Sequence, residues 1–478
     1  MKHSVFIKKY LFFIMIIIFG IFVIGTFETV CAEEANSDMR DSVATVFVDD
    51  EEKNFDDIVI AWNYTVYRAC EDTSKTVKIR LHSDWYGFSE DGEKTYNGKE
   101  YGYLKGDMSC NLVINDIDAI SNDSGDKIQA KSFRGAINIP SDCKICIDLN
   151  GYVINRNHED YQPLDGELIY VNGGAKLDII DSNVRQKNVL ADSTEQYGGT
   201  LMGGSSGNGG GCIHIKPNAE VSIEKCCIYG NNTDKHGGAI HVCKGASLKI
   251  KGTRFRGNRT EDSWDECNGG AIHNDGGKVE ISDAFFIRNQ SEDSGGAIYN
   301  NKGSLKVDNC VFEDCYSSDD GGAIYLKGGT AEIADSKFSE NIAENSGGAI
   351  YIFTKNVRLV NIIVDGNKAG ENGGGIVARD KNIIFDSIEV KNNISAKNGA
   401  GVYISNRNYV KMVGNNVIDY NLKNGRGNNI FYENSVVNYD RVFSNKNVTN
   451  MIIAFIVFAI VSVIVISFAL KKQHSQED

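Results

Sequence analysis

The tetrapeptide Gly-Gly-Ala-Ile recurs through the middle of the chain, and this recurrence restricts the possible folds more than any other feature. It begins at Gly237, Gly269, Gly295, Gly321 and Gly347, with variants from Gly210, Gly373, Gly399 and Gly427. From Gly269 to Gly399 every spacing is 26 residues, and the two earlier spacings are 27 and 32. A fixed period of this length indicates a solenoid, in which each repeat packs on its neighbours.

Each copy contains three short strand signals. The first is the GGAI segment, and the second is an alternating apolar pair such as Val279 and Ile281. The third carries a phenylalanine, at Phe255, Phe286, Phe312 and Phe338, followed three residues later by Asn258, Asn289, Cys315 and Asn341. Because no apolar period of 3.6 residues runs through the copies, helical repeats are excluded. Three strands and three turns predict an all-β, right-handed parallel β-helix with coils of about 26 residues.

Stacking of such coils explains which residues recur. Equivalent residues of successive coils lie about 4.8 Å apart in a parallel ladder. The isoleucines after the glycine pairs should form one internal column and the phenylalanines a second. The asparagines should form amide hydrogen bonds along the stack, and the glycines allow positive φ at the corner. The expected first column is Ile213, Ile240, Ile272, Ile298, Ile324, Ile350, Ile376, Val402 and Ile430.

The alternation of GGA(I/L/V) with FxxN resembles the repeats of chlamydial polymorphic membrane proteins. Five GGAI copies and three FxxN copies match as they stand, and the resemblance covers about half of the chain, from Gly209 to Tyr432. It implies a β-helix fold shared with bacterial surface proteins and an adhesin-like role. Family members are autotransporters, but we do not carry that mechanism over. After Tyr432 we expect a spacer and one helix, which is typical of a membrane-anchored relative.

The two ends of the chain predict a surface location. Residues 1–32 have the basic start, apolar run and small residues of a signal peptide, and residues 451–470 have the length of a transmembrane helix. Lys471 and Lys472 predict a cytoplasmic tail, 471–478, and a single-pass cell-membrane protein whose N-terminal ectodomain is extracellular. Between these ends we expect a capping region (33–76), irregular early coils (77–208), regular coils (209–435) and a spacer (436–450). Within the early coils, 84–126 and 183–206 are expected to be long loops that leave the coil. The net charge of −14 excludes a nucleic-acid partner.

One column of residues is a candidate ligand-binding site. Four residues after the first glycine of each copy, histidine or an aromatic residue usually occurs. If the isoleucines face inward, alternation places this column on the outer face. Exposed rings could bind a glycan or a host or cell-surface protein; alternatively, they stack to stabilise the sheet. The candidates are His214, His241, His273, Tyr299, Tyr325, Tyr351 and Tyr403.

Acidic residues cluster in the turn before each glycine pair. The candidates are Asp293, Asp319, Asp320 and Glu371. Stacked like charges repel unless they are solvated or bridged by a cation, so the alternatives are a solvated turn and a Ca²⁺ site. Cys143 and Cys146 have CxxC spacing, but their neighbourhood predicts a strand and buried small residues. We expect no cofactor other than this Ca²⁺.

The functional prediction rests on the expected surface location and on the absence of a catalytic motif in the sequence. We predict a membrane-anchored surface protein that binds a ligand or is structural, and no catalytic residue is assigned. The alternative is a surface enzyme acting on polysaccharides, a pectate-lyase-like protein or glycoside hydrolase, because such enzymes use this fold. A hydrolase needs paired carboxylates at a set separation, and no such pair is evident in the sequence.

Overall fold

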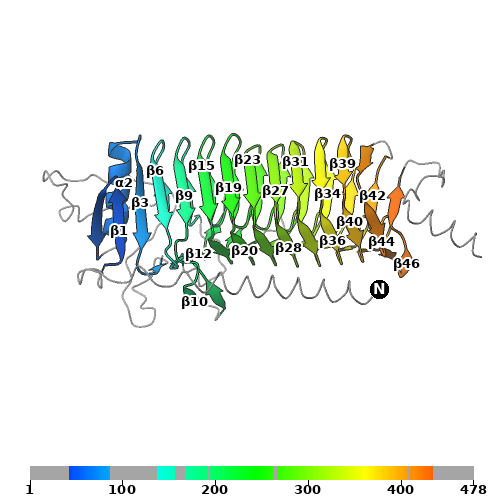
Figure 1. The fold of residues 1–478 in the computed structure, drawn as a ribbon, viewed down its shortest axis with the longest axis horizontal. Coiled ribbons are helices and arrows are strands. Elements are labelled where there is room, and N and C mark those ends of the chain that lie inside the picture. Colours follow the sequence, from blue (N-terminus) through cyan, green and yellow to red (C-terminus); the bar gives the residue numbers. More distant parts are fainter. Residues whose placement is uncertain are drawn as a thin grey trace, which may run out of the picture. The chain divides into compact units, whose positions relative to one another are not determined.

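The computed structural model describes residues 42–56, 58–86, 137–156, 167–190, 194–207, 209–261, 266–406 and 409–433. These residues fall into two compact units. Unit 1 extends to Thr233 and also includes Gly245–Arg254; unit 2 comprises Asp234–Lys244 and the residues from Phe255 onward. The units are described separately, and both are built from stacked parallel strands (Figure 1).

Each coil of unit 2 has four strands, one more than the sequence predicts. In the first complete coil they are β22 (Ile272–Asp275), β23 (Lys278–Ser282), β24 (Phe285–Ile287) and β25 (Gln290–Ser291). Strand β22 pairs in parallel with β26 (Ile298–Asn301), with Ile272 opposite Ile298. This register confirms the coil length of 26 residues. The fourth strand was missed because two residues carry no readable alternation.

Equivalent strands of successive coils form four sheets, which we name by their position in the coil. The GGAI sheet of unit 2 contains β18 (Ile240–Val242), β22, β26, β30 (Ile324–Lys327), β34 (Ile350–Phe353), β38 (Ile376–Ala378), β42 (Val402–Ile404) and β47 (Ile430–Tyr432). The long-strand sheet of unit 2 contains β23, β27 (Ser304–Asp308), β31 (Thr330–Ala334), β35 (Val357–Val360), β39 (Ile383–Asp386) and β43 (Val410–Val413).

The other two sheets of unit 2 follow the phenylalanine and asparagine positions. The phenylalanine sheet contains β20 (Arg254–Arg256), β24, β28 (Val311–Glu313), β32 (Lys337–Ser339), β36 (Ile363–Asp365), β40 (Glu389–Lys391) and β44 (Val417–Asp419). The short-strand sheet contains β21 (Arg259–Thr260), β25, β29 (Tyr316–Ser317), β33 (Ile342–Ala343), β37 (Lys368–Ala369), β41 (Ile394–Ser395), β45 (Leu422–Lys423) and the antiparallel β46 (Arg426–Gly427).

Unit 1 follows the same plan less regularly. Its long-strand sheet contains β2 (Glu51–Phe55), β1 (Ala44–Val48), β3 (Thr76–Leu81), β6 (Lys144–Asp148), β9 (Lys176–Ile180), β15 (Glu220–Glu224) and β19 (Ser247–Lys251). Its shorter strands are β4 (Trp85–Tyr86), β5 (Ile137–Ile139), β7 (Val153–Asn155), β8 (Ile169–Val171), β12 (Thr200–Met202), β13 (Ser205–Ser206), β14 (Ile213–Ile215), β16 (Cys227–Tyr229) and β17 (Asn232–Thr233).

A helix, α2 (Ile58–Glu71), occupies the stretch where a cap is expected and packs against β1, β2, β3 and β6. Trp62 of α2 contacts Trp85 of β4 at a ring-centroid distance of 5.8 Å, and both are buried. The antiparallel pairing of β1 with β2 and β3 was not predicted. The helix covers apolar residues that would otherwise be exposed beside the first strands.

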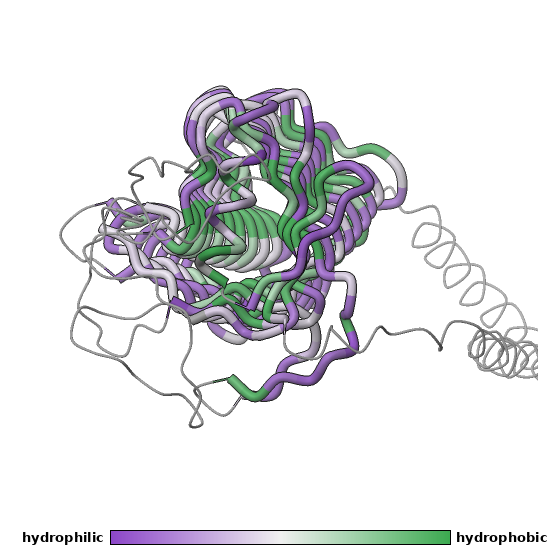
Figure 2. Tube along the Cα trace, turned by 90° about the vertical axis from the view of Figure 1, so that its left-hand side faces the viewer, coloured by the Kyte–Doolittle hydropathy of each residue, from purple (hydrophilic) through white to green (hydrophobic). Residues whose placement is uncertain are grey.

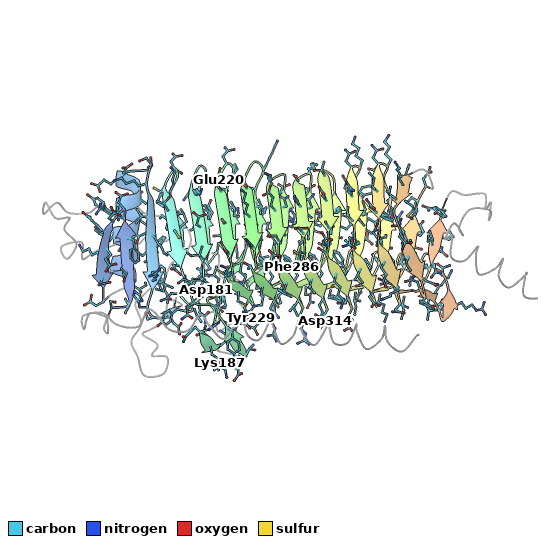
Figure 3. The ribbon with its side chains drawn as sticks, viewed as in Figure 1. Asp181, Lys187, Glu220, Tyr229, Phe286 and Asp314 are labelled. Carbon is cyan, nitrogen blue, oxygen red and sulfur yellow. The ribbon has the colours of Figure 1, made fainter. Side chains whose placement is uncertain are left out.

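The expected long loop at 183–206 is wrong in part. Strands β10 (Lys187–Val189) and β11 (Glu195–Tyr197) form an antiparallel hairpin, in which Figure 3 labels Lys187. Strands β12 and β13 lie within the same segment and belong to coils, since β12 pairs in parallel with β7 and β16. Only the hairpin leaves the coil. The other expected loop, 84–126, lies outside the described residues except for its first three, which include β4.

Two apolar columns form the interior of unit 2, as predicted (Figure 2). Ile272, Ile298, Ile324 and Ile350 are opposite one another in the register and are completely buried. The second column consists of Phe255, Phe286, Phe312 and Phe338, whose ring centroids are 4.7 Å apart at interplanar angles of 2 to 5°. Figure 3 labels Phe286 in this column. Burial and face-to-face contact of these four rings stabilise the coils that carry them.

Asparagine amides connect successive coils at the corner after the phenylalanine sheet. The main-chain N–H and the side-chain amide of Asn341 both donate to Oδ1 of Asn367, at 3.0 and 2.8 Å. Asn367 makes the same two bonds to Asn393, at 2.9 Å each. All three side chains are completely buried. The predicted amide hydrogen bonds are confirmed, and we call this series the asparagine ladder.

The two glycines of each pair are needed for different reasons. The first has positive φ, for example 73° at Gly295, as predicted. The second faces the next coil: a Cβ on Gly296 would lie 2.1 Å from the carbonyl oxygen of Gly322. Because no side chain fits that approach, the second glycine permits the coils to stack at this corner.

The expected signal peptide and the expected transmembrane helix, residues 451–470, lie outside the described residues. Within the described part of the chain, no helix is both long enough and apolar enough to cross a membrane.

Candidate functional site

The predicted ring positions lie side by side on the GGAI sheet of unit 2. Each is the second residue of its strand, and the register places His241 opposite His273, His273 opposite Tyr299, and Tyr325 opposite Tyr351. Val377 interrupts the series before Tyr403 and Phe431. We call these residues of unit 2 the ring column.

The rings stack instead of presenting their faces to solvent. Centroid distances are 5.0 Å between His273 and Tyr299, 5.1 Å between Tyr299 and Tyr325, and 4.9 Å between Tyr325 and Tyr351. The exposed fraction is 4% for Tyr299, 6% for Tyr351 and 4% for Tyr403. The expectation of an exposed row is therefore wrong for these tyrosines and for His273, whereas Tyr325, His241 and Phe431 are half-buried. A spacing near 5 Å leaves no room for a ligand between rings.

Cationic side chains lie over parts of the ring column that ring stacking leaves uncovered. The Lys327 ammonium lies 6.0 Å from the centre of the Tyr299 ring. The Arg379 guanidinium lies 5.7 Å from the Tyr351 ring and 5.4 Å from the Tyr403 ring, beside the position where Val377 supplies no ring. The sequence analysis missed Arg379. The sequence feature that could have indicated it is Val377, two residues earlier, which interrupts the ring column.

Burial sets the acidity of the tyrosines. It is the main cause that raises the pKa of Tyr325 to about 12, and the nearby carboxylates of Asp320 and Asp319 raise this pKa further. Burial also raises the pKa of Tyr299 and Tyr351 above the usual range. These phenols stay neutral at physiological pH, so the ring column carries no charge of its own.

A cluster of three histidines lies at one end of the ring column. His236, which the sequence analysis missed, packs on His273 at 4.3 Å between ring centroids, and His241 lies 5.3 Å from His273. Burial, followed by the neighbouring His241 and His236, holds the pKa of His273 well below its ordinary value. The sequence feature that could have indicated His236 is its position directly before Gly237.

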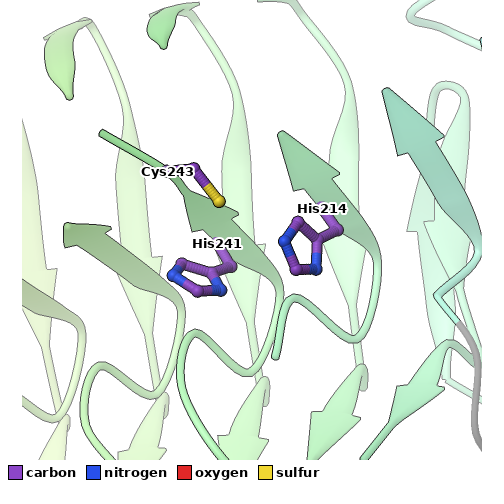
Figure 4. Close-up of side chains that lie close together, drawn as sticks. All are labelled: His214, His241 and Cys243. Atoms are coloured by element: carbon purple, nitrogen blue, oxygen red, sulfur yellow. The ribbon is translucent and has the colours of Figure 1, made fainter. Parts of the chain in front are cut away.

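In unit 2, the side chains of His241 and Cys243 place potential metal-ligand atoms within 4.8 Å of each other (Figure 4). Both could contribute to a metal site, but a tetrahedral zinc site needs four ligands. His214 belongs to unit 1, where it is buried on β14. There its Nδ1 lies 3.2 Å from Oε1 of the buried Glu167, and its ring packs against Tyr170.

The four acidic candidates are half-buried and hydrogen-bonded in the turns of unit 2. Asp319 accepts from the Ser294 hydroxyl at 3.0 Å, and Asp320 accepts from the main-chain N–H of Ser346 at 2.9 Å. Asp293 accepts from the main-chain N–H of Cys267, and Glu371 pairs with Lys397. Most of these partners lie one coil away. In the described part of the chain, none of the four belongs to a group of three close metal ligands.

The surroundings of Asp320 change its acidity. Burial, and then repulsion from Asp319, raises the pKa of its carboxyl to about 7, although the hydrogen bond from Ser346 acts in the opposite direction. A carboxyl group that is half protonated near neutral pH can donate or accept a proton. The structure thus singles out Asp320, which the sequence placed in the acidic cluster without distinguishing it.

One comparison with known proteins agrees with this geometry. Residues 335–352, which run from the turn before β32 to the start of β34, match the Chlamydia polymorphic membrane protein repeat. Neither the curated proteins nor the solved structures contain a match to the chain. The repeat match and the stacked parallel coils together describe a β-helix repeat protein that is similar to the polymorphic membrane proteins.

Proposed function

We propose that this polymorphic membrane protein-like β-helix is displayed on the cell surface, held by its C-terminal apolar segment, and binds a protein of another cell or of the surrounding matrix. The observation that supports this role is a row of exposed aliphatic side chains on the regular coils. Such side chains are rarely displayed in series on a protein that has no partner.

The row lies on the short-strand sheet of unit 2. Outward positions of successive coils pair in the register, from Tyr316 to Ile342, Lys368, Ile394 and Leu422. Ile342, Ile394 and Leu422 are 38 to 45% exposed, whereas the alternate residues of the first two strands, Ala343 and Ser395, are buried. We call these three residues the aliphatic row.

A second, parallel series supports the same surface. The phenylalanine sheet contributes Phe285, Ile363 and Val417, which are also exposed. In the register, Val311 and Lys337 lie between Phe285 and Ile363, and Glu389 lies between Ile363 and Val417. Along each of these two sheets, exposed apolar side chains therefore alternate with charged ones such as Lys337 and Lys368. That mixture is typical of protein interfaces, which have an apolar centre and a polar surround.

The ring column favours a protein partner over a glycan. Glycan sites commonly place an aromatic face against a sugar ring, and the stacked tyrosines of this chain use both faces within the column. Aliphatic side chains such as Ile342 and Ile394 instead fit an apolar protein surface. A glycan is therefore the alternative outcome of the binding experiment.

The test is binding of the full-length chain, in detergent micelles, to arrays of cell-surface proteins, matrix proteins and glycans. Replacing Ile342, Ile394 and Leu422 together by serine should weaken protein binding at least about tenfold, because each side chain contributes on the order of 1 kcal/mol of buried apolar area. The matched control replaces Lys306, Glu332 and Arg358 by serine, since these are exposed, register-paired residues of the long-strand sheet. Glycan binding that both triple variants retain would contradict the proposal.

Asp320 supports a second candidate function, cleavage of a polysaccharide by hydrolysis or by elimination. A carboxyl group with a pKa of about 7 is suited to general acid catalysis, and Arg379 contributes a nearby positive charge. New reducing ends or unsaturated products, formed by the wild-type chain and lost in Asp320→Asn, would support the enzyme. Cleavage that persists in Asp320→Asn would remove this residue as the acid.

A further inference from the structure

Two cysteines of unit 1 are held in contact although they lie 73 residues apart in the sequence. Cys70 is in the last turn of α2, and Cys143 is in the turn that precedes β6. Their sulfur atoms are 3.0 Å apart. Ordinary non-bonded heavy atoms stay about 3.5–4.0 Å apart, and a disulfide bond is about 2.05 Å long. The pair is therefore closer than packing alone requires.

Both sulfur atoms are carried by well-fixed main chain. Cys143 donates its N–H to Pro140 at 3.3 Å, and its carbonyl accepts from Lys176 of the next coil at 2.9 Å. On the other side, α2 is anchored by Trp62, which packs against Trp85, and by Tyr64, which packs against Phe55. Formation of a bond therefore needs only a small approach of two atoms that already face each other.

Other cysteines of the chain have different environments. The thiols of Cys226, Cys310 and Cys315 donate to main-chain carbonyls inside the coils, at 3.2, 3.1 and 3.5 Å. Cys146, the second residue of the CxxC spacing, lies opposite Lys78 in the register, and burial is the main cause that raises the pKa of its thiol to about 11. The partner of Cys143 is thus Cys70 and not its neighbour in sequence.

We propose that Cys70 and Cys143 form a disulfide bond that fastens the capping helix α2 to the first coils of unit 1. In the reaction the two thiols lose two protons and two electrons to a small-molecule or protein disulfide, which is reduced to two thiols. The new bond closes a loop of 73 residues, and cross-linking of a long loop restricts the unfolded chain strongly. Its formation in the cell rests on the proposed surface location, since disulfides persist in oxidising compartments.

Trypsin digestion distinguishes the cysteines. Cleavage after Arg68, Lys75, Arg134, Lys144 and Arg156 yields peptide 69–75 with Cys70, peptide 135–144 with Cys143 and peptide 145–156 with Cys146. The full-length chain is equilibrated with oxidised glutathione, alkylated, digested without reductant and analysed by mass spectrometry. We expect peptides 69–75 and 135–144 to be joined, and dithiothreitol to separate them. Alkylation of both cysteines, or a link from 69–75 to 145–156, would overturn the proposal.

A stability measurement provides a second test. Reduction, Cys70→Ser and Cys143→Ser should each lower the melting temperature of unit 1 by a similar amount, and reduction should not lower it further in either variant. Cys146→Ser is the matched control and should remain sensitive to reduction. If the link forms in glutathione but both thiols are reduced in protein taken directly from cells, the surface location fails while the site stands. If no link forms in glutathione, the site itself is wrong.

Discussion

Unit 1 and unit 2 are built from the same parallel coils, but they satisfy the buried polar groups of their turns differently. Unit 2 repeats one amide hydrogen-bond pattern, the asparagine ladder, from coil to coil. Unit 1 uses individual carboxylates: Asp148 is completely buried and lies 2.8 Å from Lys78 Nζ and 3.0 Å from Arg80 Nε. A ladder requires an asparagine at the same corner of every coil, whereas one carboxylate can accept several hydrogen bonds from donors in different segments of the chain.

Asp181 shows how this works in unit 1. Its side chain accepts hydrogen bonds from the main-chain N–H groups of Gly151, Asn183 and Gly199, at 2.7, 3.1 and 2.7 Å. These donors come from three different segments around the hairpin of β10 and β11. Repetition of sequence therefore gives repeated contacts in unit 2, and the irregular sequence of unit 1 gives turn-specific contacts.

The largest effect is expected for Asp148→Ala in unit 1. The variant leaves Lys78 and Arg80 without their counter-charge, together with the main-chain donors of Asn150 and Ser182. Breaking a buried pair by removing one partner costs about 3–5 kcal/mol of unfolding free energy. Urea unfolding measures the change. Glu220→Ala, an exposed residue of β15, is the control and should change stability by less than about 0.5 kcal/mol.

The acidity of Asp148 predicts how its contribution depends on pH. Burial alone would raise the pKa of this carboxyl, but hydrogen bonds from Lys78, Ser182 and Arg80 outweigh it and lower the pKa below 3.8. Its stabilising contribution is therefore present above the unfolded pKa and is lost as pH falls through the folded pKa. A cost of Asp148→Ala that stays constant down to pH 2 would show that the ion pairs are not responsible.

A smaller loss is expected in unit 2 for Asn367→Ala. It removes two bonds accepted from Asn341 and two donated by the side-chain amide, to the Phe338 carbonyl and to Oδ1 of Asn393, and it leaves buried amide groups unsatisfied. We expect a loss of about 2 kcal/mol, measured by urea unfolding. The exposed Asn392→Ala is the control. A loss at Asn367 as large as that at Asp148 would mean that the two units do not differ as described.

Asp320→Asn tests a carboxylate of unit 2 whose pKa is raised by burial and by Asp319 more than Arg379 lowers it. Because its folded pKa of about 7 lies above the unfolded 3.8, the protonated form stabilises the protein at low pH, and this contribution is lost as pH rises through 7. The variant should therefore be more stable than wild type at pH 8, by about 2 kcal/mol after allowance for solvent screening, and similar at pH 4. Asp335→Asn, at an exposed turn, should show no such pH-dependent gain.

The smallest effect is a gain from Cys315→Asn. Cys315 interrupts the asparagine ladder, yet its N–H still donates to Oδ1 of Asn341 at 3.0 Å. An asparagine there would restore the missing amide, and we expect a stabilisation of up to about 1 kcal/mol. A loss of stability in this variant would indicate that the sulfur fills a space that the amide cannot occupy.

The same comparison shows what the sequence could predict. In unit 2 the coil length, the isoleucine and phenylalanine columns and the amide bonds were all predicted, because each repeats at a fixed interval. In unit 1 the roles of Asp148 and Asp181 were missed, because each occurs once and its donors are distant in sequence. The contact of Cys70 with Cys143 was missed for the same reason: no spacing shows which segments a solenoid brings together.

The candidate site was predicted less well than the fold. Alternation correctly placed the ring column on the opposite strand face from Ile298 and Ile324, but it could not show that the stacked rings bury one another. Nor could it show that Arg379 lies beside the gap at Val377. Nor could it show that burial and the neighbouring Asp319 carboxylate raise the pKa of Asp320.

The most direct test of the account is simultaneous replacement of Tyr299, Tyr325 and Tyr351 by alanine, with the corresponding phenylalanine triple variant as the control. The account predicts that the alanine variant melts well below wild type, because stacked and buried rings are removed. It also predicts that the protein still folded at low temperature binds its partner as wild type does, since binding is assigned to the aliphatic row. An unchanged melting temperature together with lost binding would contradict the account and make the ring column the binding site.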